Sequence, residues 1–226
     1  MELIARGRDA DVYAVDESRV LRRYRDGRRT GHEAPLMAFL QAAGYPVPKV
    51  YEATGTDLVM ERLHGPTLME AVERAPWRVG AFGRTLGALH DRLHAIAAPG
   101  WLPKRFSRET GDRVLHLDLH PGNVMLTDRG PVVIDWCNAA AGDPAADLAM
   151  TVVTVGGADV PGLAARLGRG LLLRGVRSGS RTDPSVRLRE VARHKLADPN
   201  LTPAEAAWLR RRAGGATAEA DIGPRR

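Results

Sequence analysis

The chain has 226 residues, of which 44% are hydrophobic, and this length allows one substantial core or two small lobes. No apolar run approaches the roughly 20 residues that a membrane-spanning helix needs, and the N-terminus lacks a signal-peptide pattern. We therefore expect a cytoplasmic protein without a membrane partner. The single cysteine, Cys137, excludes an internal disulfide and a multi-cysteine metal site, and its thiol is expected to be buried rather than reactive.

The net charge of +6 is unevenly distributed, since residues 1–150 carry −1 and residues 151–226 carry +7. A pI of about 10.1 would suit a nucleic-acid-binding protein. However, the chain offers only four Tyr and three Phe for base stacking, and it contains no recognised nucleic-acid motif. We therefore interpret the C-terminal arginines as solvent-exposed helix faces and treat a nucleic-acid partner as the less favoured alternative.

The amino-terminal part is predicted to contain five strands and one helix. Residues 3–24 have the pattern of an antiparallel meander of three short strands, whose first turn lies at Gly7. A helix is expected over residues 32–43, followed by strands at 50–53 and 57–61.

The third strand of this meander carries two adjacent arginines. Period-two alternation places Val20, Arg22 and Tyr24 on one face of the strand, and Leu21 with Arg23 on the other. Only one of the two arginines can therefore face a ligand on a given side of the sheet.

After residue 62 the chain is predicted to be mostly helical. Apolar residues that recur at three- and four-residue steps over residues 79–96 indicate an amphipathic helix. His90 and His94, four residues apart on it, could form a metal pair, but we interpret them as core residues because no metalloprotease glutamate lies between them. Further helices are expected at 67–74, 148–155, 162–173, 186–196 and 202–212, the last opening with a capping box at Thr202 and Glu205. Loops are expected at 99–113 and 177–183, and residues 213–226 are expected to be disordered.

The candidate catalytic and metal-binding residues lie between Val114 and Met150. Asp118 is followed five residues later by Asn123, and Asp135 ends a later apolar run. Short strands are expected at 114–117, 124–126 and 132–134, and a hairpin between the last two would bring Asn123 close to Asp135. Polar residues of an ordinary turn would not require this spacing, which is that of the catalytic Asp and the metal-binding Asn and Asp of protein kinases.

The sequence His-Leu-Asp-Leu-His-Pro-Gly-Asn at 116–123, with Ile-Asp-Trp at 134–136, resembles the aminoglycoside phosphotransferase and choline kinase family. The resemblance implies an α+β, two-lobed protein-kinase-like fold and an ATP- and Mg²⁺-dependent transfer of phosphate to a hydroxyl of a small molecule. In this family Asp118 would accept the hydroxyl proton, while Asn123 and Asp135 would hold Mg²⁺. The implied parts are a nucleotide-binding lobe at 1–62, a catalytic and substrate-binding lobe at 63–212, and the tail at 213–226.

The resemblance also implies a nucleotide site between the lobes. The hairpin at Gly7 would close over the phosphates, and the backbone of the connector at Glu61 and Leu63 would bind adenine. Asp147 would brace the catalytic loop through backbone N–H groups rather than react.

One position departs from the family pattern. Arg22 stands where the family carries the lysine that reaches the nucleotide phosphates, and Arg23 is the alternative if the strand register differs by one residue. Glu33 would pair with this cation, or would otherwise be an exposed glutamate in the first turn of its helix. A guanidinium can still bind phosphate, although its length and geometry differ from those of an ammonium group.

The acceptor is not defined by the sequence. Aminoglycosides generally require an acidic pocket, which the basic residues 151–226 do not provide, so amino alcohols, sugars and other natural products are equal candidates. The alternative function is a non-catalytic nucleotide-binding or regulatory kinase-like protein, which Arg22 and the sparse glycine loop favour. Protein-kinase activity is disfavoured because no long activation segment follows Asp135.

Overall fold

The computed structural model describes residues 1–7, 10–25, 27, 31–107 and 111–214. Most of the predicted disordered tail, residues 215–226, lies outside the described residues. Its first residue, Ala213, is instead buried against the last helices, and its carbonyl accepts hydrogen bonds from Arg189 and Arg193, both at 3.1 Å. No helix among the described residues is long and apolar enough to cross a membrane.

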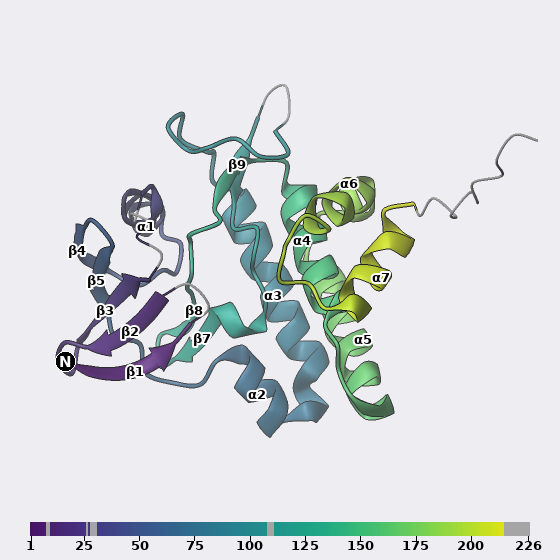
Figure 1. Cartoon of the computed structure of the whole chain (residues 1–226), viewed down its shortest axis with the longest axis horizontal. Helices are drawn as coiled ribbons and strands as arrows, with labels where there is room; N and C mark the ends of the chain where they lie inside the picture. The colour runs from purple at the N-terminus through teal and green to yellow at the C-terminus, as the bar shows by residue number, and fades with distance from the viewer. Residues whose placement is uncertain (8–9, 26, 28–30, 108–110, 215–226) are drawn as a thin grey trace, which may run out of the picture.

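In the described part of the chain, the amino-terminal lobe is a five-stranded antiparallel sheet with one helix beside it (Figure 1). The strand order is β1-β2-β3-β5-β4. The elements are β1 (Glu2–Arg6), β2 (Ala10–Ala14), β3 (Arg19–Tyr24), α1 (Glu33–Ala42), β4 (Val50–Thr54) and β5 (Asp57–Glu61). The expected α+β architecture is thereby confirmed, whereas the lobe boundary at residues 62 and 63 stays a prediction.

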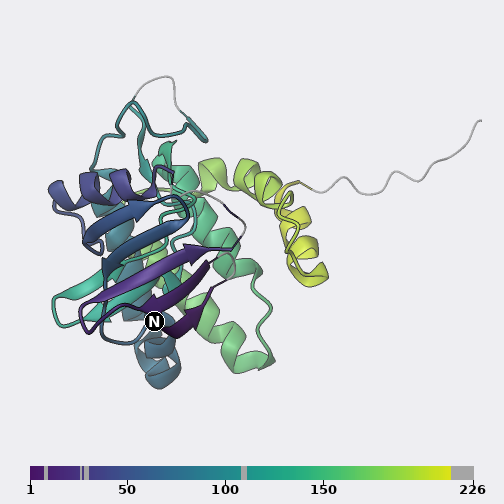
Figure 2. The same ribbon diagram turned by 60° about the vertical axis from the view of Figure 1, so that its left-hand side comes forward.

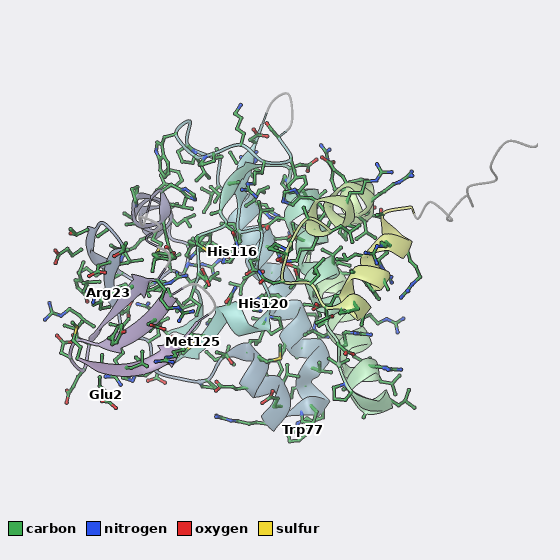
Figure 3. All side chains as sticks on the ribbon, viewed as in Figure 1. Glu2, Arg23, Trp77, His116, His120 and Met125 are labelled. Carbon is green, nitrogen blue, oxygen red and sulfur yellow. The ribbon has the colours of Figure 1, made fainter. Side chains whose placement is uncertain are left out.

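The two arginines of β3 have opposite environments. Arg22 is only 8% exposed, whereas Arg23 lies at the surface, where its Nε donates to Asp57 Oδ1 at 2.8 Å. The alternation expected for a strand therefore holds at these two positions. Figure 3 shows Arg23 on the outer part of the sheet, away from the middle of the molecule.

The second lobe is mostly helical and lies on the other side of the molecule (Figures 1 and 2). Its elements are α2 (Leu68–Arg74), η1 (Pro76–Arg78), α3 (Val79–His94), β6 (Arg113–Leu115), η2 (Pro121–Asn123), β7 (Val124–Thr127), β8 (Gly130–Val133), β9 (Ala140–Gly142), α4 (Pro144–Gly157), α5 (Gly162–Gly179), α6 (Ser185–Lys195) and α7 (Pro203–Arg212). The capping boxes that open α2 and α7, at Thr67 and Thr202, are both present.

Helices α3 and α5 run side by side and pack through glycines (Figure 1). A Cβ on Gly87 would lie 2.3 Å from the carbonyl oxygen of Val176, and one on Gly179 would lie 2.4 Å from that of Arg84. The absence of side chains therefore sets how closely the two helices approach. The predicted end of α5 at residue 173 is wrong, because its glycine- and serine-rich last turns remain helical against α3.

The strand expected at 114–117 is shorter than predicted. It ends at Leu115 and pairs antiparallel with β9, a strand that no local sequence pattern indicates. Leu117 has a positive φ of 61°, which takes the chain out of the extended conformation just before Asp118. The predicted β7–β8 hairpin is present, with Val124 opposite Val133.

Candidate active site

A cleft of about 1160 Å³ lies between the two lobes, a size suited to a nucleotide with a second small molecule. Figure 3 places His116 and His120 near the middle of the molecule, between the sheet and the helices of the second lobe. The cleft is lined by seven of the eight predicted site residues: Gly7, Arg22, Glu61, Leu63, Asp118, Asn123 and Asp135. The eighth, Glu33, is buried at 2% exposure behind Arg22.

The loop that carries Asp118 is held in place by its own side chains. Asn123 Nδ2 donates to the carbonyl oxygen of Asp118 at 2.9 Å, and the Asp118 N–H donates to His116 Nδ1 at 3.2 Å. The Asp118 carboxylate faces the cleft, 3.9 Å from His120 Nε2. Burial lowers the pKa of His120, so this histidine is neutral near pH 7 and does not form a full ion pair with Asp118.

Asp147, at the start of α4, holds the backbone of this loop by hydrogen bonds. Its carboxylate accepts the N–H groups of Leu117 at 2.7 Å and of His116 at 3.2 Å. Burial alone would raise the pKa of Asp147, but the side-chain contacts of His90 and His94 hold it well below its usual value. The charged carboxylate thereby fixes Leu117 in its left-handed conformation, next to Asp118.

His90, His94 and Asp147 are the candidate metal-binding group within the described residues. His94 Nε2 donates to Asp147 at 2.9 Å, while His90 Nε2 lies 2.9 Å from the hydroxyl oxygen of Thr151. Both Asp147 oxygens also accept backbone N–H groups. These contacts favour a hydrogen-bonded core network over a metal site, in agreement with the interpretation of the two histidines as core residues.

Arg22 joins two carboxylates across the lobes. Its Nη1 donates to Glu33 Oε1 and its Nη2 to Asp135 Oδ1, each at 2.7 Å. Glu33 is fixed further by the hydroxyl of Tyr24 and by the N–H of Trp136. The cation of β3 and the glutamate of α1 thus pair directly, so the exposed first-turn alternative for Glu33 is wrong.

These ion pairs set the charges of the residues involved. Burial alone would raise the pKa of Asp135, but the nearby Arg22 lowers it below its usual value. Burial alone would lower the pKa of Arg22, but Glu33 and Asp135 raise it instead. All of these contacts stabilise the ionised forms in a largely buried setting.

The β7–β8 hairpin brings the two candidate metal ligands together. The N–H of Ile134 donates to the carbonyl oxygen of Asn123 at 3.0 Å, so Asn123 and Asp135 lie at neighbouring strand ends. Asn123 uses its amide nitrogen toward Asp118, which leaves its side-chain oxygen as a donor atom for a metal. Two oxygen-bearing side chains that line the same cleft suit Mg²⁺.

At the predicted phosphate loop and the connector between the lobes, groups of Gly7 and Glu61 bond within the protein rather than toward a nucleotide. The N–H of Gly7 donates to the carbonyl oxygen of Ala10 at 2.8 Å and is therefore not directed at a ligand. Residues 8 and 9 of this predicted phosphate loop lie outside the described residues. The Glu61 carboxylate accepts from Arg129 at 2.7 Å, and the Glu61 N–H donates to the carbonyl oxygen of Lys49 at 2.8 Å, so both groups are engaged within the protein.

Several cleft residues were not predicted from the sequence. Arg105, His194 and Lys195 line the cleft from a loop and from α6, far from any recognised motif. Cys137 also lines it and is half-buried. The thiol is therefore less buried than expected, although burial still raises its pKa, as expected for an unreactive cysteine.

The sequence model of the phosphotransferase enzyme family matches residues 1–114 and 101–188. The chain therefore belongs to this family, and the predicted resemblance is confirmed.

Solved structures of similar shape include small-molecule kinases. The streptomycin–ATP–APH(2")-IIa ternary complex matches with a TM-score of 0.61 at 15% identity, covering 86% of this chain and 84% of the other. A choline/ethanolamine kinase family protein from Mesorhizobium loti matches with a TM-score of 0.60 at 16% identity, covering 94% and 86%. At these identities the likeness shows the kinase-like fold alone.

A curated relative by sequence is the EKC/KEOPS complex subunit BUD32 of Encephalitozoon cuniculi. It is 39% identical over 66 residues, which are 29% of this chain and 33% of the relative. The chain spans a third or less of the length of the curated relatives that it matches.

Proposed function

We propose that the protein is an ATP- and Mg²⁺-dependent phosphotransferase that phosphorylates a hydroxyl group of a small molecule. The observation that carries this proposal is the convergence of Asp118, Asn123 and Asp135 on one cleft, beside the buried Arg22–Glu33 pair. Membership of the phosphotransferase enzyme family supports the reaction class. The choice of nucleotide is supported by the streptomycin–ATP–APH(2")-IIa complex, a protein of similar fold that binds ATP.

Each residue has a separate role in this proposal. Asp118 orients the acceptor hydroxyl and accepts its proton. Asn123 and Asp135 hold Mg²⁺, which when bound neutralises phosphate charge. Arg22 binds phosphate oxygens while Glu33 holds its guanidinium in place, so catalysis consists mainly of positioning and charge neutralisation.

A second candidate is a non-catalytic nucleotide-binding or regulatory kinase-like protein. The direct bond from Arg22 to Asp135 favours it, because a metal would have to compete with a guanidinium for that carboxylate. Arg22 has five N–H donors, however, and only two are used toward Glu33 and Asp135. The remaining donors suit phosphate binding in either candidate, and we favour the enzyme because the chain belongs to the phosphotransferase enzyme family.

The two candidates are separated by measuring acceptor-dependent ADP release alongside Mg-ATP binding. The panel should contain aminoglycosides, amino alcohols, sugars, hydroxy acids and other natural products with hydroxyl groups. Release of ADP that depends on one acceptor class, with phosphate found on that acceptor, supports the enzyme. Tight Mg-ATP binding without turnover on any acceptor supports the non-catalytic protein.

A further inference from the structure

The wall of the cleft beyond Asp118 is formed by segments that the family motifs do not include. Residues from the loop before β6, from α6 and from the segment after it line this wall. Because Phe106, next to Arg105, packs against the cluster that contains Leu117, this wall lies near Asp118 and is where the acceptor of the proposed reaction would lie. The charge of the acceptor can therefore be inferred from the charged side chains of this wall.

The carboxylates of the cleft, apart from Asp118, are already engaged by the protein's own groups. Glu61 accepts from Arg129 and Asp135 from Arg22, both at 2.7 Å. The remaining two are Asp198, which accepts from Lys195 at 2.9 Å, and Glu205, which accepts the N–H of Thr202 at 2.8 Å. Among the described cleft residues, a cationic acceptor would therefore find no carboxylate without a partner except the proposed base.

Unlike these carboxylates, the side chain of Arg105 has no charged partner among the described residues. It is exposed and lines the cleft, and its backbone N–H is fixed by donation to Ala141 at 2.9 Å. Within the described residues, its guanidinium has no ion pair and no hydrogen bond. A guanidinium fork that the protein does not use is suited to bind a planar carboxylate or a phosphate in two-pronged fashion.

Two residues of α6, His194 and Lys195, line the same wall. His194 packs against Phe106 with ring centres 5.1 Å apart, and its pKa is lowered by partial burial and by the charges of Arg105 and Lys195. Lys195 is also close enough to lower the pKa of His120. The lowered pKa favours the neutral form of His194, and Lys195 is paired with Asp198 at 2.9 Å, so within the described residues Arg105 is the cation of this wall without a carboxylate partner.

We propose that the acceptor is a small hydroxyl compound that carries an anionic group, a carboxylate or a phosphate, which Arg105 binds while the hydroxyl lies at Asp118. This inference rests on the proposed function and defines its substrate class. In the transfer, the acceptor oxygen forms a bond to the γ-phosphorus of ATP and the bond from that phosphorus to the β–γ bridging oxygen breaks. ADP leaves, and the hydroxyl proton passes to Asp118.

The test compares acceptors in pairs that differ in charge. D-Glycerate and gluconate are each measured beside their primary amides, and glycerol 3-phosphate is measured beside glycerol, with kanamycin and choline as cationic acceptors. We expect kcat/KM for the anionic member to exceed that of its neutral partner by roughly tenfold or more, the scale of one charge-assisted bidentate contact. Comparing the kcat/KM ratio of the two carboxylate–amide pairs with that of the glycerol 3-phosphate–glycerol pair shows whether a carboxylate or a phosphate is preferred.

Two variants test whether Arg105 causes the preference for anionic acceptors. Arg105→Ala should abolish the preference for the anionic acceptor while Mg-ATP affinity stays unchanged, because Arg105 is exposed and should not affect folding. Lys104→Ala is the matched control, since this neighbouring lysine is 70% exposed and does not line the cleft. It should behave as the wild type.

The outcomes separate this inference from the proposed function. Turnover of neutral or cationic acceptors that equals or exceeds that of the anionic ones overturns the inference and leaves the proposed function in place. A preference that survives in Arg105→Ala overturns the assignment to this wall. Mg-ATP binding without ADP release on any acceptor overturns the proposed function and the inference with it.

Discussion

Arg22 connects the two lobes, because its guanidinium bonds both Glu33 of α1 and Asp135 after β8, each at 2.7 Å. Strand alternation predicted that Arg22 and Arg23 face opposite ways, and pairing with Glu33 was the expected consequence of the kinase-like register. The contact with Asp135 could not be predicted, because it joins residues 113 positions apart. It depends on how the two lobes meet.

Replacing the two arginines should give opposite results. Arg22→Ala leaves Glu33 buried without its cation, which should cost about 3–5 kcal/mol of stability and weaken Mg-ATP binding strongly. Arg23→Ala removes a surface pair and should cost about 0–1 kcal/mol with little effect on binding. Urea unfolding and calorimetric titration with Mg-ATP measure both quantities. Arg22→Lys restores the usual family residue and should retain binding; loss of binding in Arg23→Ala alone would contradict the register.

The buried His90 predicts how stability depends on pH. Burial holds its pKa below the usual value of 6.5, although Asp147 acts in the opposite direction. As the pH falls through about 6.5, the unfolded chain takes up this proton before the folded chain does, so the free energy of unfolding should decrease.

His90→Gln should reduce this acid-induced loss, because the variant has no titrating group at the position. Urea unfolding of both proteins between about pH 7.5 and about pH 5.5 gives the difference in slope. If the wild type instead gains stability relative to the variant on acidification, His90 is charged in the fold and paired with Asp147.

At the level of elements, patterns with a clear local signal were predicted well. The β7–β8 hairpin and the capping box of α7 follow from turn and cap residues that act within a few positions. The Ala-Ala-Gly strand β9 has no such signal, since it is a strand only because β6 lies beside it. The last turns of α5 were missed for the same reason, because their glycines are fixed by contact with α3.

The glycine contact between α3 and α5 can be tested with a matched pair of substitutions. Gly87→Ala places a methyl group against the Val176 carbonyl and should lower the free energy of unfolding by about 1–3 kcal/mol or more. Gly170→Ala lies on α5 where a Cβ would meet nothing within 4 Å, and it should raise stability by about 0.5–1 kcal/mol. Equal effects of the two substitutions on urea unfolding would show that the helices do not pack this closely.

At the level of the whole molecule, the sequence predicted the side of the cleft that carries the kinase motifs and not the opposite wall. Asp118, Asn123 and Asp135 belong to one short stretch with a fixed spacing, so their meeting follows from local structure. Arg105 and His194 have no motif around them. His194 reaches the cleft because α6 packs on α4, whereas Arg105 is held beside β9 by the bond from its N–H to the Ala141 carbonyl. Substrate specificity therefore had to be inferred from the folded structure.

We propose that Asp118 acts as the base in phosphoryl transfer, and the turnover of Asp118→Asn with its best acceptor measures this role. The amide keeps the shape of the side chain but cannot accept the hydroxyl proton. Acceptor-dependent ADP release should fall by roughly 10²–10⁴-fold, while Mg-ATP affinity stays close to that of the wild type. Turnover close to the wild-type rate would contradict the account.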